Sequence, residues 1–261
     1  MADEYEFPFH CLSDYELKSL CNTAESYCDS LFADYLTSLK GSVQSDCLNF
    51  KYYTESEFSN QFHSYSTSVD LSVLHMNIRS LNSKVRSFCQ FIHLLDYVFD
   101  VIVLSEIWAY NIDYYRNILP GYEFYYNLPI DSKVGGVGIF VRNCYSVQEL
   151  NHFNIASSDN CKVENLWLQV SSSSKKYIVA GIYRHPNQNI SEFKCKLESE
   201  LQKLSVQSTP CIIAGDINID LLKFEVHSGI EEFVDTLLTS DFSPMPLRIT
   251  SRSSSLLLLI T

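Results

Sequence analysis

From Leu71 onward, short apolar runs rich in Val and Ile alternate with longer segments whose apolar residues repeat with helical spacing. Short runs of this kind predict buried strands, and the longer segments predict amphipathic helices. The alternation restricts the chain to a layered α/β fold with several central strands. The predicted strands are Ser72–Asn77, Val101–Ser105, Tyr122–Tyr126, Val137–Val141, Glu164–Val170, Tyr177–Tyr183 and Cys211–Gly215, and the predicted helices are Ser83–Val98, Ile190–Leu204 and Ile230–Ser240, with Ser83 and Ser191 as N-caps.

Residues 1–70 form an acidic leader whose composition differs from that of the remaining chain. They hold 12 Asp or Glu and 3 Lys or Arg, whereas residues 71–261 hold 19 and 16. Helical spacing of apolar residues in 14–40 predicts that the leader is partly helical and otherwise disordered. We therefore predict a leader, 1–70, followed by one domain, 71–261. The net charge of −12 lies mostly in the leader, and no basic stripe indicates strong non-specific DNA affinity.

The cysteines and the first residues bear on the compartment. Nine cysteines are scattered without a C-x-x-C pair, which is typical of free thiols in a reducing compartment. A zinc site of His10, Cys11, Cys21 and Cys28 is the alternative, although its spacings differ from those of common zinc modules. The N-terminus lacks the basic and apolar parts of a signal peptide, and Leu256–Ile260 is too short to cross a bilayer. We expect an intracellular protein without a membrane segment.

Polar groups follow four of the predicted strands. VIVLS is followed by Glu106, CIIAG is followed by Asp216 and Asn218, SVLHMN ends on Asn77, and KYIVAGIY ends on Tyr183. If these strands lie side by side, the polar groups meet at one edge of the sheet, where α/β folds tend to bind ligands. The sequence therefore predicts a polar site at the ends of the strands.

Each of these residues also has an ordinary structural interpretation. A carboxylate after an apolar strand is commonly the first solvated residue, an Asn commonly forms a turn, and a Tyr commonly packs at the rim of a core. The D-x-N spacing is more specific, because residues i and i+2 of an extended segment face the same way. Asp216 and Asn218 are therefore expected to act on one ligand, while Ile217 points into the core.

Several segments together carry a resemblance to a known family. They are HMNIRSLNSK (75–84), DVIVLSEIW (100–108), GYEFYYN (121–127), GGVGIFV (135–141), AGIYRHPN (180–187) and AGDINIDLL (214–222). In order and spacing they resemble the endonuclease/exonuclease/phosphatase superfamily, and they are most similar to the endonuclease domain of non-LTR (LINE-type) retrotransposons. The leader segment 52–62 is similar to the stretch just ahead of that domain. The resemblance implies a DNase I-like, four-layer α/β/β/α sandwich of two mixed β-sheets.

The resemblance also implies roles for the matching residues. Glu106 would be the main ligand of Mg²⁺ (or Mn²⁺), and Asn77 and Asp216 would complete the metal site. Asn77 would orient a phosphate oxygen or a metal-bound water, Tyr183 would donate to the phosphate, and Asp216 and Asn218 would position the attacking water. Mg²⁺ prefers hard oxygen ligands, and a metal ion polarises a phosphoryl oxygen, so the residue types suit phosphodiester hydrolysis.

Further implications concern partners and one additional carboxylate. Glu164 lies where the family often has a Glu, and it would either orient its neighbours or only begin a strand. The implied substrate is the phosphate backbone of DNA. A reverse transcriptase domain would accompany the endonuclease in a complete element, which would need access to the nucleus. We expect a monomer.

The chain departs from the family at its end. The family closes its active site with an Asp-His pair on a late strand, and FSPMPLRITSRSSSL (242–256) resembles the stretch before it. Here Leu258 and Leu259 stand in the Asp and His places. Leucine accepts no proton, and loss of a positioned base costs about 10²–10⁴-fold in rate. We expect impaired hydrolysis, a truncated last strand and lower stability. His185 is the best-placed substitute base, but its YRHP context favours a role in shaping the loop.

Four functions follow from this pattern. The first is a DNA-nicking endonuclease that leaves a 3′-hydroxyl, and the second is an inactive remnant of such an enzyme. The third is another phosphatase or phosphodiesterase of the same superfamily, because the metal core does not distinguish the substrates. The fourth is a binding module without catalysis.

Other motifs favour structural roles. Gly135-Gly136-Val137-Gly138 lacks a following Lys-Ser/Thr and enters a strand, so a turn is favoured over a phosphate loop. Lys175-Lys176 is expected at a hairpin tip, where it would be solvated or would touch a DNA backbone. Trp108 and Trp167 are expected in the core.

Overall fold

The computed structural model describes residues 55–62, 70–109, 112–129, 133–223, 227–240, 242–246 and 255–259. The chain divides into two compact units, one of 1–70 with 83–98 and one of 71–82 with 99–261. The predicted helical segment 14–40 and the proposed zinc residues lie outside the described residues. The boundary predicted at residue 70 stays a prediction.

The first unit contributes two described helices. Helix α3 spans Glu55–Phe62, and helix α4 spans Leu81–Leu94, most of which belongs to this unit. The ring of Phe58 contacts that of Tyr97 edge to face, with centroids 5.8 Å apart. Ser83 is not an N-cap, because α4 begins earlier than predicted.

The start of α4 is hydrogen-bonded to the segment that follows strand Val101–Ser105. The backbone N–H groups of Ser80 and Leu81 donate to the carbonyls of Glu106 and Ile107, at 2.8 and 2.7 Å. The bond from Leu81 satisfies one of the N–H groups that the start of a helix leaves without an intrahelical partner. Ser80 is the residue directly before the helix.

The second unit contains a four-stranded mixed sheet. Its strands are β1 (Val73–Asn77), β2 (Val101–Ser105), β3 (Tyr122–Asn127) and β4 (Val137–Arg142), in the order β1-β2-β4-β3. β1 and β2 are parallel, and the other pairs are antiparallel. All five residues of β2 are buried, as its uninterrupted apolar run predicts.

A six-stranded mixed sheet completes the strands of this unit. It contains β5 (Ser146–Glu149), β6 (Val163–Ser171), β7 (Lys176–Arg184), β8 (Cys211–Asp216), β10 (Ser255–Leu259) and β9 (Ser243–Pro246), in that order. β7 and β8 are parallel, and the remaining pairs are antiparallel. Lys175 lies at the tip of the β6–β7 hairpin, where its carbonyl accepts from Ser172 N at 2.8 Å, so the predicted hairpin is confirmed.

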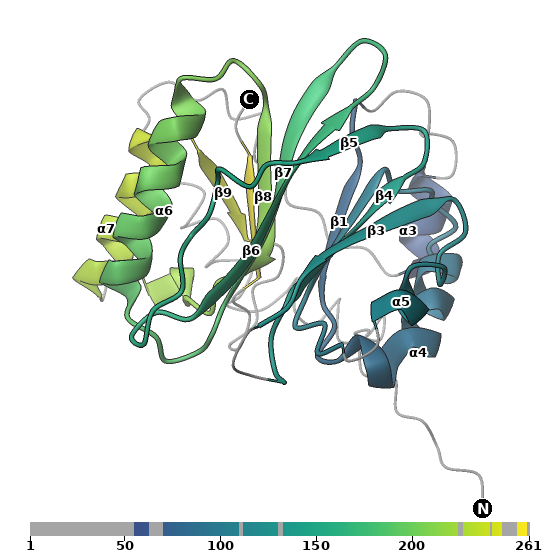
Figure 1. The fold of residues 1–261 in the computed structure, drawn as a ribbon, viewed down its shortest axis with the longest axis horizontal. Coiled ribbons are helices and arrows are strands. Elements are labelled where there is room, and N and C mark those ends of the chain that lie inside the picture. The colour runs from purple at the N-terminus through teal and green to yellow at the C-terminus, as the bar shows by residue number, and fades with distance from the viewer. Residues whose placement is uncertain are drawn as a thin grey trace, which may run out of the picture. The chain divides into compact units, whose positions relative to one another are not determined.

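The two sheets pack face to face around one apolar core (Figure 1). The four-stranded sheet contributes Val101, Val103, Val137, Ile139 and Val141, and the six-stranded sheet contributes Leu166, Leu168, Val170, Val179, Tyr183 and Ala214. Alternate residues of each strand point into this core. Gly181 allows a close approach, because a Cβ there would overlap the side chain of Val137.

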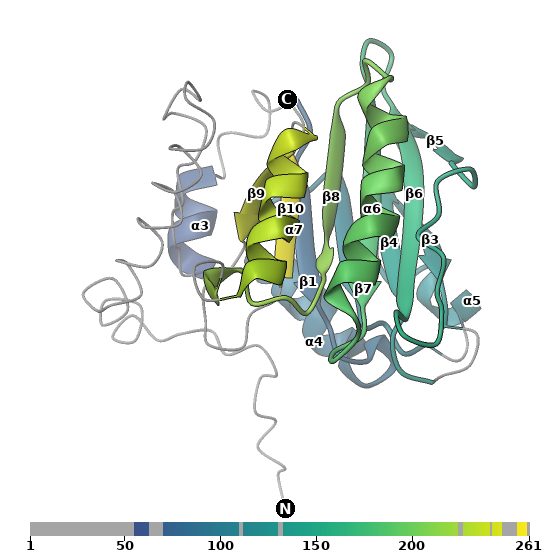
Figure 2. The ribbon, with the colours of Figure 1, turned by 90° about the vertical axis from the view of Figure 1, so that its left-hand side faces the viewer.

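Helices cover the outer face of the six-stranded sheet (Figures 1 and 2). Helix α6 spans Ile190–Ser205 and α7 spans Ser228–Thr239, and the rings of Phe193 and Phe233 stack between them at 5.9 Å. The N-cap of α6 is Asn189 rather than Ser191, since the Asn189 side chain accepts from Glu192 N at 2.9 Å. Two short helices, α5 (Ile112–Tyr115) and the 3₁₀ helix η2 (Leu221–Lys223), lie in loops.

The two tryptophans differ in their surroundings. Trp167 is buried, and its indole N–H donates to the side-chain oxygen of Asn165 at 2.8 Å. Trp108 is only half-buried, so its predicted place in the core is not fully matched. Its indole nitrogen is nevertheless enclosed, and no hydrogen-bond partner for it occurs among the described residues.

The architecture confirms the predicted fold class, an α/β fold of two mixed sheets with helices. The acidic leader lies outside the described residues, apart from the end that forms α3. None of the helices in the described part of the chain has the length and apolar character needed to cross a membrane.

Gly215→Ala is expected to lower the free energy of unfolding by about 2 kcal/mol or more, because overpacking forces backbone shifts. A Cβ at Gly215 would overlap the backbone of Ile182 on the neighbouring strand β7. Gly229→Ala is the matched control, since a Cβ there has open space and alanine favours a helix by up to about 1 kcal/mol. Urea unfolding of both variants checks the difference, and equal stabilities would contradict it.

Candidate active site

A row of polar side chains crosses one end of the six-stranded sheet. Glu164 of β6 lies directly opposite Tyr183 of β7, which in turn lies opposite Asp216 of β8. Directly opposed residues point to the same face of a sheet, so these three side chains are neighbours. Tyr183 belongs to the core between the sheets, which places the row on the face toward the four-stranded sheet.

The four-stranded sheet brings Asn77 and Glu106 to the same place. Asn77 ends β1, and Glu106 directly follows β2. The Asn77 side-chain nitrogen donates to Glu106 Oε1 at 2.7 Å and to Asp216 Oδ2 at 2.6 Å. Because one nitrogen contacts both carboxylates, their oxygens lie within two hydrogen-bond lengths of each other. Glu106 and Asp216 are only 9% and 5% exposed, so two anionic groups meet in a largely dehydrated space.

Left-handed backbone positions the residues after β1 and β2. Glu106 has φ 57°, Trp108 has φ 40°, and Arg79 and Ser80 have φ 45° and 89°. Non-glycine residues in such conformations cost on the order of 1–3 kcal/mol each and persist only where the surroundings hold them. Trp108 N donates to the carbonyl of Gly135 at 3.0 Å, and Ser80 N donates to the carbonyl of Glu106, so the loops hold one another.

A buried arginine holds the turn that carries Asp216. Arg184 is 1% exposed, and its guanidinium donates to the carbonyls of Ile217, Asn218 and Gln188 at 2.5, 2.7 and 2.8 Å. Asn218 adopts φ 51°, and its side chain returns a hydrogen bond to the Arg184 carbonyl at 2.7 Å. Arg184 therefore fixes the backbone that presents the carboxylate.

The central residue of the segment Asp216–Asn218 is buried, as the D-x-N spacing predicts. Ile217 is 3% exposed, as predicted, and Asn218 N donates to Asp216 Oδ1 at 3.1 Å. The Asp216 side chain reaches Asn77, whereas the Asn218 amide reaches the Arg184 carbonyl. That Asp216 and Asn218 act on one ligand stays a prediction.

The environment keeps Tyr183 protonated and makes His75 a weak base. Burial raises the pKa of the Tyr183 phenol above its usual value, and the carboxylates of Glu106, Asp216 and Glu164 raise it further. The hydroxyl is therefore a hydrogen-bond donor at neutral pH. Burial lowers the pKa of His75 to about 4, although Asp216 opposes the shift. His75 lies on β1, where its Nε2 contacts Ser105 Oγ at 3.1 Å.

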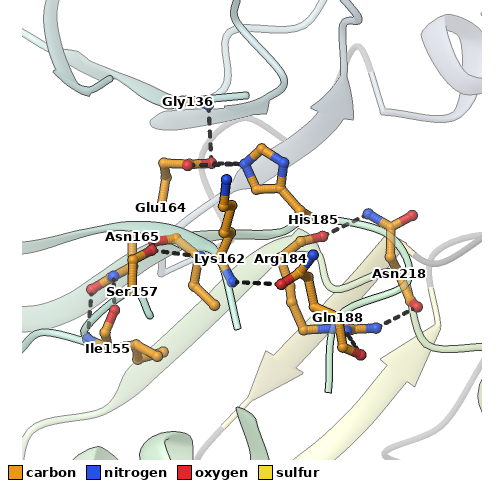
Figure 3. A network of polar contacts seen from close by, with 11 residues as sticks. Gly136, Ile155, Ser157, Lys162, Glu164, Asn165, Arg184, His185, Gln188 and Asn218 are labelled. Carbon is orange, nitrogen blue, oxygen red and sulfur yellow. Dashed lines mark hydrogen bonds and ion pairs between the residues drawn. The ribbon is translucent and has the colours of Figure 1, made fainter. Parts of the chain in front are cut away.

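A carboxylate–histidine pair extends the row (Figure 3). Glu164 and His185 face each other, with His185 Nε2 at 3.0 and 3.1 Å from the two carboxylate oxygens. The ring of His185 also lies against that of Tyr183, with centroids 4.9 Å apart. The Gly136 N–H points at Glu164 Oε2 from 3.3 Å. His185 is thus part of the side-chain cluster as well as of the loop after β7.

The donor set suits one hard divalent cation at Glu106 and Asp216. Mg²⁺ is commonly bound by one or two carboxylates and several waters, and the carboxylate oxygens here already converge on a single donor. No group of three or more His, Cys, Asp or Glu close enough to hold a metal occurs among the described residues. Ligation by Asn77 would require its amide to reverse, because its oxygen now accepts from Arg79 N at 3.2 Å.

Sequence comparison identifies the family. The model of the endonuclease/exonuclease/phosphatase family matches residues 74–249, which include Asn77, Glu106, Tyr183 and Asp216. The chain belongs to this family. A comparison with curated proteins gave no match.

Several solved structures share the fold at low sequence identity. The endonuclease domain of TRAS1, a telomere-specific non-LTR retrotransposon, is 12% identical with a TM-score of 0.52, over 73% of this chain and 84% of that chain. D. rerio TDP2 complexed with a single-strand DNA product is 18% identical with a TM-score of 0.52, over 73% and 84%. The human Nocturnin catalytic domain is 15% identical with a TM-score of 0.53, over 73% and 82%. These likenesses confirm the DNase I-like fold expected of the family.

The structure brings together Asn77, Glu106, Tyr183 and Asp216, four of the five residues predicted from strand ends. The side chain of the fifth, Asn218, donates a hydrogen bond to the Arg184 carbonyl instead. Arg184 was not predicted from the sequence, although its position at the end of an apolar strand could have indicated it. Leu258 and Leu259 of β10 lie opposite Ile213 and Ile212, whereas Ser255 lies opposite Asp216. The two leucines therefore lie three and four residues along β10 from Ser255, the residue that faces Asp216.

Arg184→Lys is expected to lower the free energy of unfolding by about 2–4 kcal/mol, because a lysine cannot satisfy three separate carbonyls. The Arg184 guanidinium also lies over the ring of Phe193, 5.8 Å from its centroid, and this contact would be lost. Arg116→Lys is the matched control, since Arg116 is half exposed and pairs with Asp113 on the surface, and it should change stability by less than about 0.5 kcal/mol. Chemical denaturation measures both, and a stable Arg184→Lys variant would refute the bracing role.

Proposed function

We propose that this chain carries a divalent-metal-dependent phosphodiester hydrolase site that nicks DNA and leaves a 3′-hydroxyl. The observation that supports it most directly is that the Asn77 amide donates hydrogen bonds both to Glu106, at the end of the four-stranded sheet, and to Asp216, at the end of the six-stranded sheet. Membership of the endonuclease/exonuclease/phosphatase family supports the same chemistry.

Glu106 and Asp216 would hold Mg²⁺ or Mn²⁺. When bound, the cation would polarise a phosphoryl oxygen and offset the negative charge that develops on the phosphate. A bound cation would stabilise the negative charges of these two buried carboxylates, because neither has enough water around it to do so. Asn77 would be a third ligand only with its amide reversed, and otherwise it would donate to a phosphate oxygen.

The remaining residues would bind and orient the phosphodiester. Tyr183 remains protonated at neutral pH, so its hydroxyl would donate to a phosphate oxygen as negative charge builds up. Asp216 and Asn218 would position the attacking water on the side opposite the leaving oxygen. Arg184 holds the backbone of this segment and would not itself touch the substrate.

DNA is the proposed substrate because of both the motifs and the relatives. The HMNIRSLN and YRHPN segments resemble those of retrotransposon endonucleases, and TRAS1 is a structural neighbour from such an element. A reverse transcriptase partner, access to the nucleus and a monomeric state are parts of the same proposal. Residues 71–261 hold 16 basic and 19 acidic side chains, so DNA binding would be local rather than driven by a large basic surface.

The second candidate function is an inactive remnant of the same enzyme. It is favoured by Leu258 and Leu259, neither of which transfers a proton. Under this alternative the metal and DNA sites persist, but hydrolysis is absent. An enzyme that hydrolyses DNA slowly would be intermediate between these two candidate functions.

Glu106→Gln and Asp216→Asn are expected to abolish Mg²⁺-dependent nicking of supercoiled plasmid. Both variants remove a carboxylate ligand with little change in shape, so Mg²⁺ should no longer raise the melting temperature. Glu149→Gln, on the exposed edge strand β5, is the matched control and should retain both properties. Nicking that persists in Glu106→Gln, or that needs no metal, would refute the proposed site.

The substrate class is tested separately with DNA, inositol phosphates and sphingomyelin under the same metal concentration. We expect hydrolysis of DNA alone. Hydrolysis of a small phosphate ester or a lipid in place of DNA would leave the metal site intact and overturn the proposed substrate.

A further inference from the structure

The Glu164–His185 pair lies in the row of the candidate active site, but none of the roles above uses its proton chemistry. Glu164 is directly opposite Tyr183 on the neighbouring strand, and His185 lies two residues beyond Tyr183. Burial of the pair is substantial, with the side chains 9% and 14% exposed. A histidine beside a carboxylate next to a phosphate-binding tyrosine is placed for proton transfer.

Backbone contacts fix both members of the pair. The His185 N–H donates to the carbonyl of Lys162 at 3.0 Å, which sets the ring beside Glu164. On the other side, a Cβ at Gly135 would come within 2.8 Å of Glu164 Oε2 and 3.0 Å of His185 Nε2. Gly135 has φ 114°, so only glycine suits this position on both counts. The Gly135-Gly136 turn therefore admits the pair and covers it.

The two nitrogens of the His185 ring have different environments (Figure 3). Nε2 faces the carboxylate, and the other ring nitrogen, Nδ1, points away from Glu164. Within the described residues, no hydrogen bond ends on Nδ1, and Nδ1 is not among the enclosed polar atoms without a partner. The His185 side chain is 14% exposed, so the ring is not sealed from solvent. A carboxylate that accepts from Nε2–H fixes the tautomer in which Nδ1 carries a free lone pair.

We propose that His185 is the base that takes a proton from the attacking water, and that Glu164 positions it. This inference rests on the proposed function. The water oxygen forms a bond to phosphorus, its proton passes to His185 Nδ1, and the P–O3′ bond breaks with its electron pair on O3′. O3′ takes a proton from solvent, and His185 later releases its own to solvent.

Charged and titratable groups from several elements lie around the pair, including Lys162, whose carbonyl accepts from the His185 N–H and whose side chain is drawn near the pair in Figure 3. Glu164 faces His185 from β6, Tyr183 faces it from β7, and the Gly135-Gly136 turn brings no charge. Glu106 and Asp216 lie beyond Tyr183, whose pKa they raise together with Glu164, and Arg79 acts on the same phenol in the opposite direction.

The experiment measures plasmid nicking against pH at saturating Mg²⁺. His185→Gln should lose about 10²–10⁴-fold in rate, as expected for loss of a general base. Glu164→Gln should lose about 10–100-fold in rate, because the imidazole loses the carboxylate that fixes its tautomer and orientation. His152→Gln makes the same change at an exposed loop position and should match the unmodified protein.

Two further readouts separate proton transfer from a purely structural role. Imidazole should rescue His185→Ala in proportion to its neutral form, which restored packing alone would not produce. The ¹⁵N chemical shifts of His185 should report the proton on Nε2 in the unmodified protein, and Glu164→Gln should weaken that preference. The second measurement needs no catalytic activity and does not depend on the folding of a His185 variant.

Each outcome decides between the two proposals. If the unmodified protein nicks DNA and His185→Gln nicks at the same rate and pH dependence, the pair is not the base, and the proposed function stands. If Mg²⁺ stabilises the protein through Glu106 but no DNA is nicked, the proposed nicking activity and the base are both overturned, and only the metal site remains. If Mg²⁺ neither stabilises the protein nor supports nicking, the proposed function itself fails.

Discussion

The hydrogen bonds from Asn77 to Glu106 and Asp216 are the interaction on which the arrangement of the site depends. Glu106 follows β2 of the four-stranded sheet, and Asp216 ends β8 of the six-stranded sheet. A single amide nitrogen joins them at 2.7 and 2.6 Å, so the ends of two separate sheets meet at one point. This point exists only because the apolar faces of the two sheets pack against each other. The core thus positions the polar site.

Two features of this arrangement are energetically unfavourable, and the surrounding loops stabilise them. Two nearly buried carboxylates repel one another, and Glu106 itself adopts a left-handed backbone conformation. Strain of this kind is retained where the surroundings hold it and where a function uses it. The surroundings include the mutual hydrogen bonds of the loops after β1 and β2, and the guanidinium of Arg184 beneath the Asp216 turn. A divalent cation between the carboxylates would offset the remaining repulsion.

Local sequence patterns predicted the central strands well and the ends of elements less well. The apolar runs beginning at Val101 and Cys211 became β2 and β8, because uninterrupted β-branched stretches have few other stable solutions. The short strand β5 was missed, since its exposed residues carry no apolar signal. The predicted N-caps were wrong because α4 begins at Leu81, before Ser83, and because the side chain of Asn189 rather than that of Ser191 caps α6.

The sequence by itself determined the α/β class, the strands and the polar residues at their ends, because periodicity and strand termini are local properties. It also indicated Asn77, Glu106, Tyr183, Asp216 and Asn218 as a set. Only the tertiary structure decided which groups touch. Glu164 and His185 are 21 residues apart, and strand register together with a glycine turn brings them to 3.0 Å. Register is set by the match between the apolar patterns of two strands and by the turn that joins them, so the pattern of one strand alone does not give it.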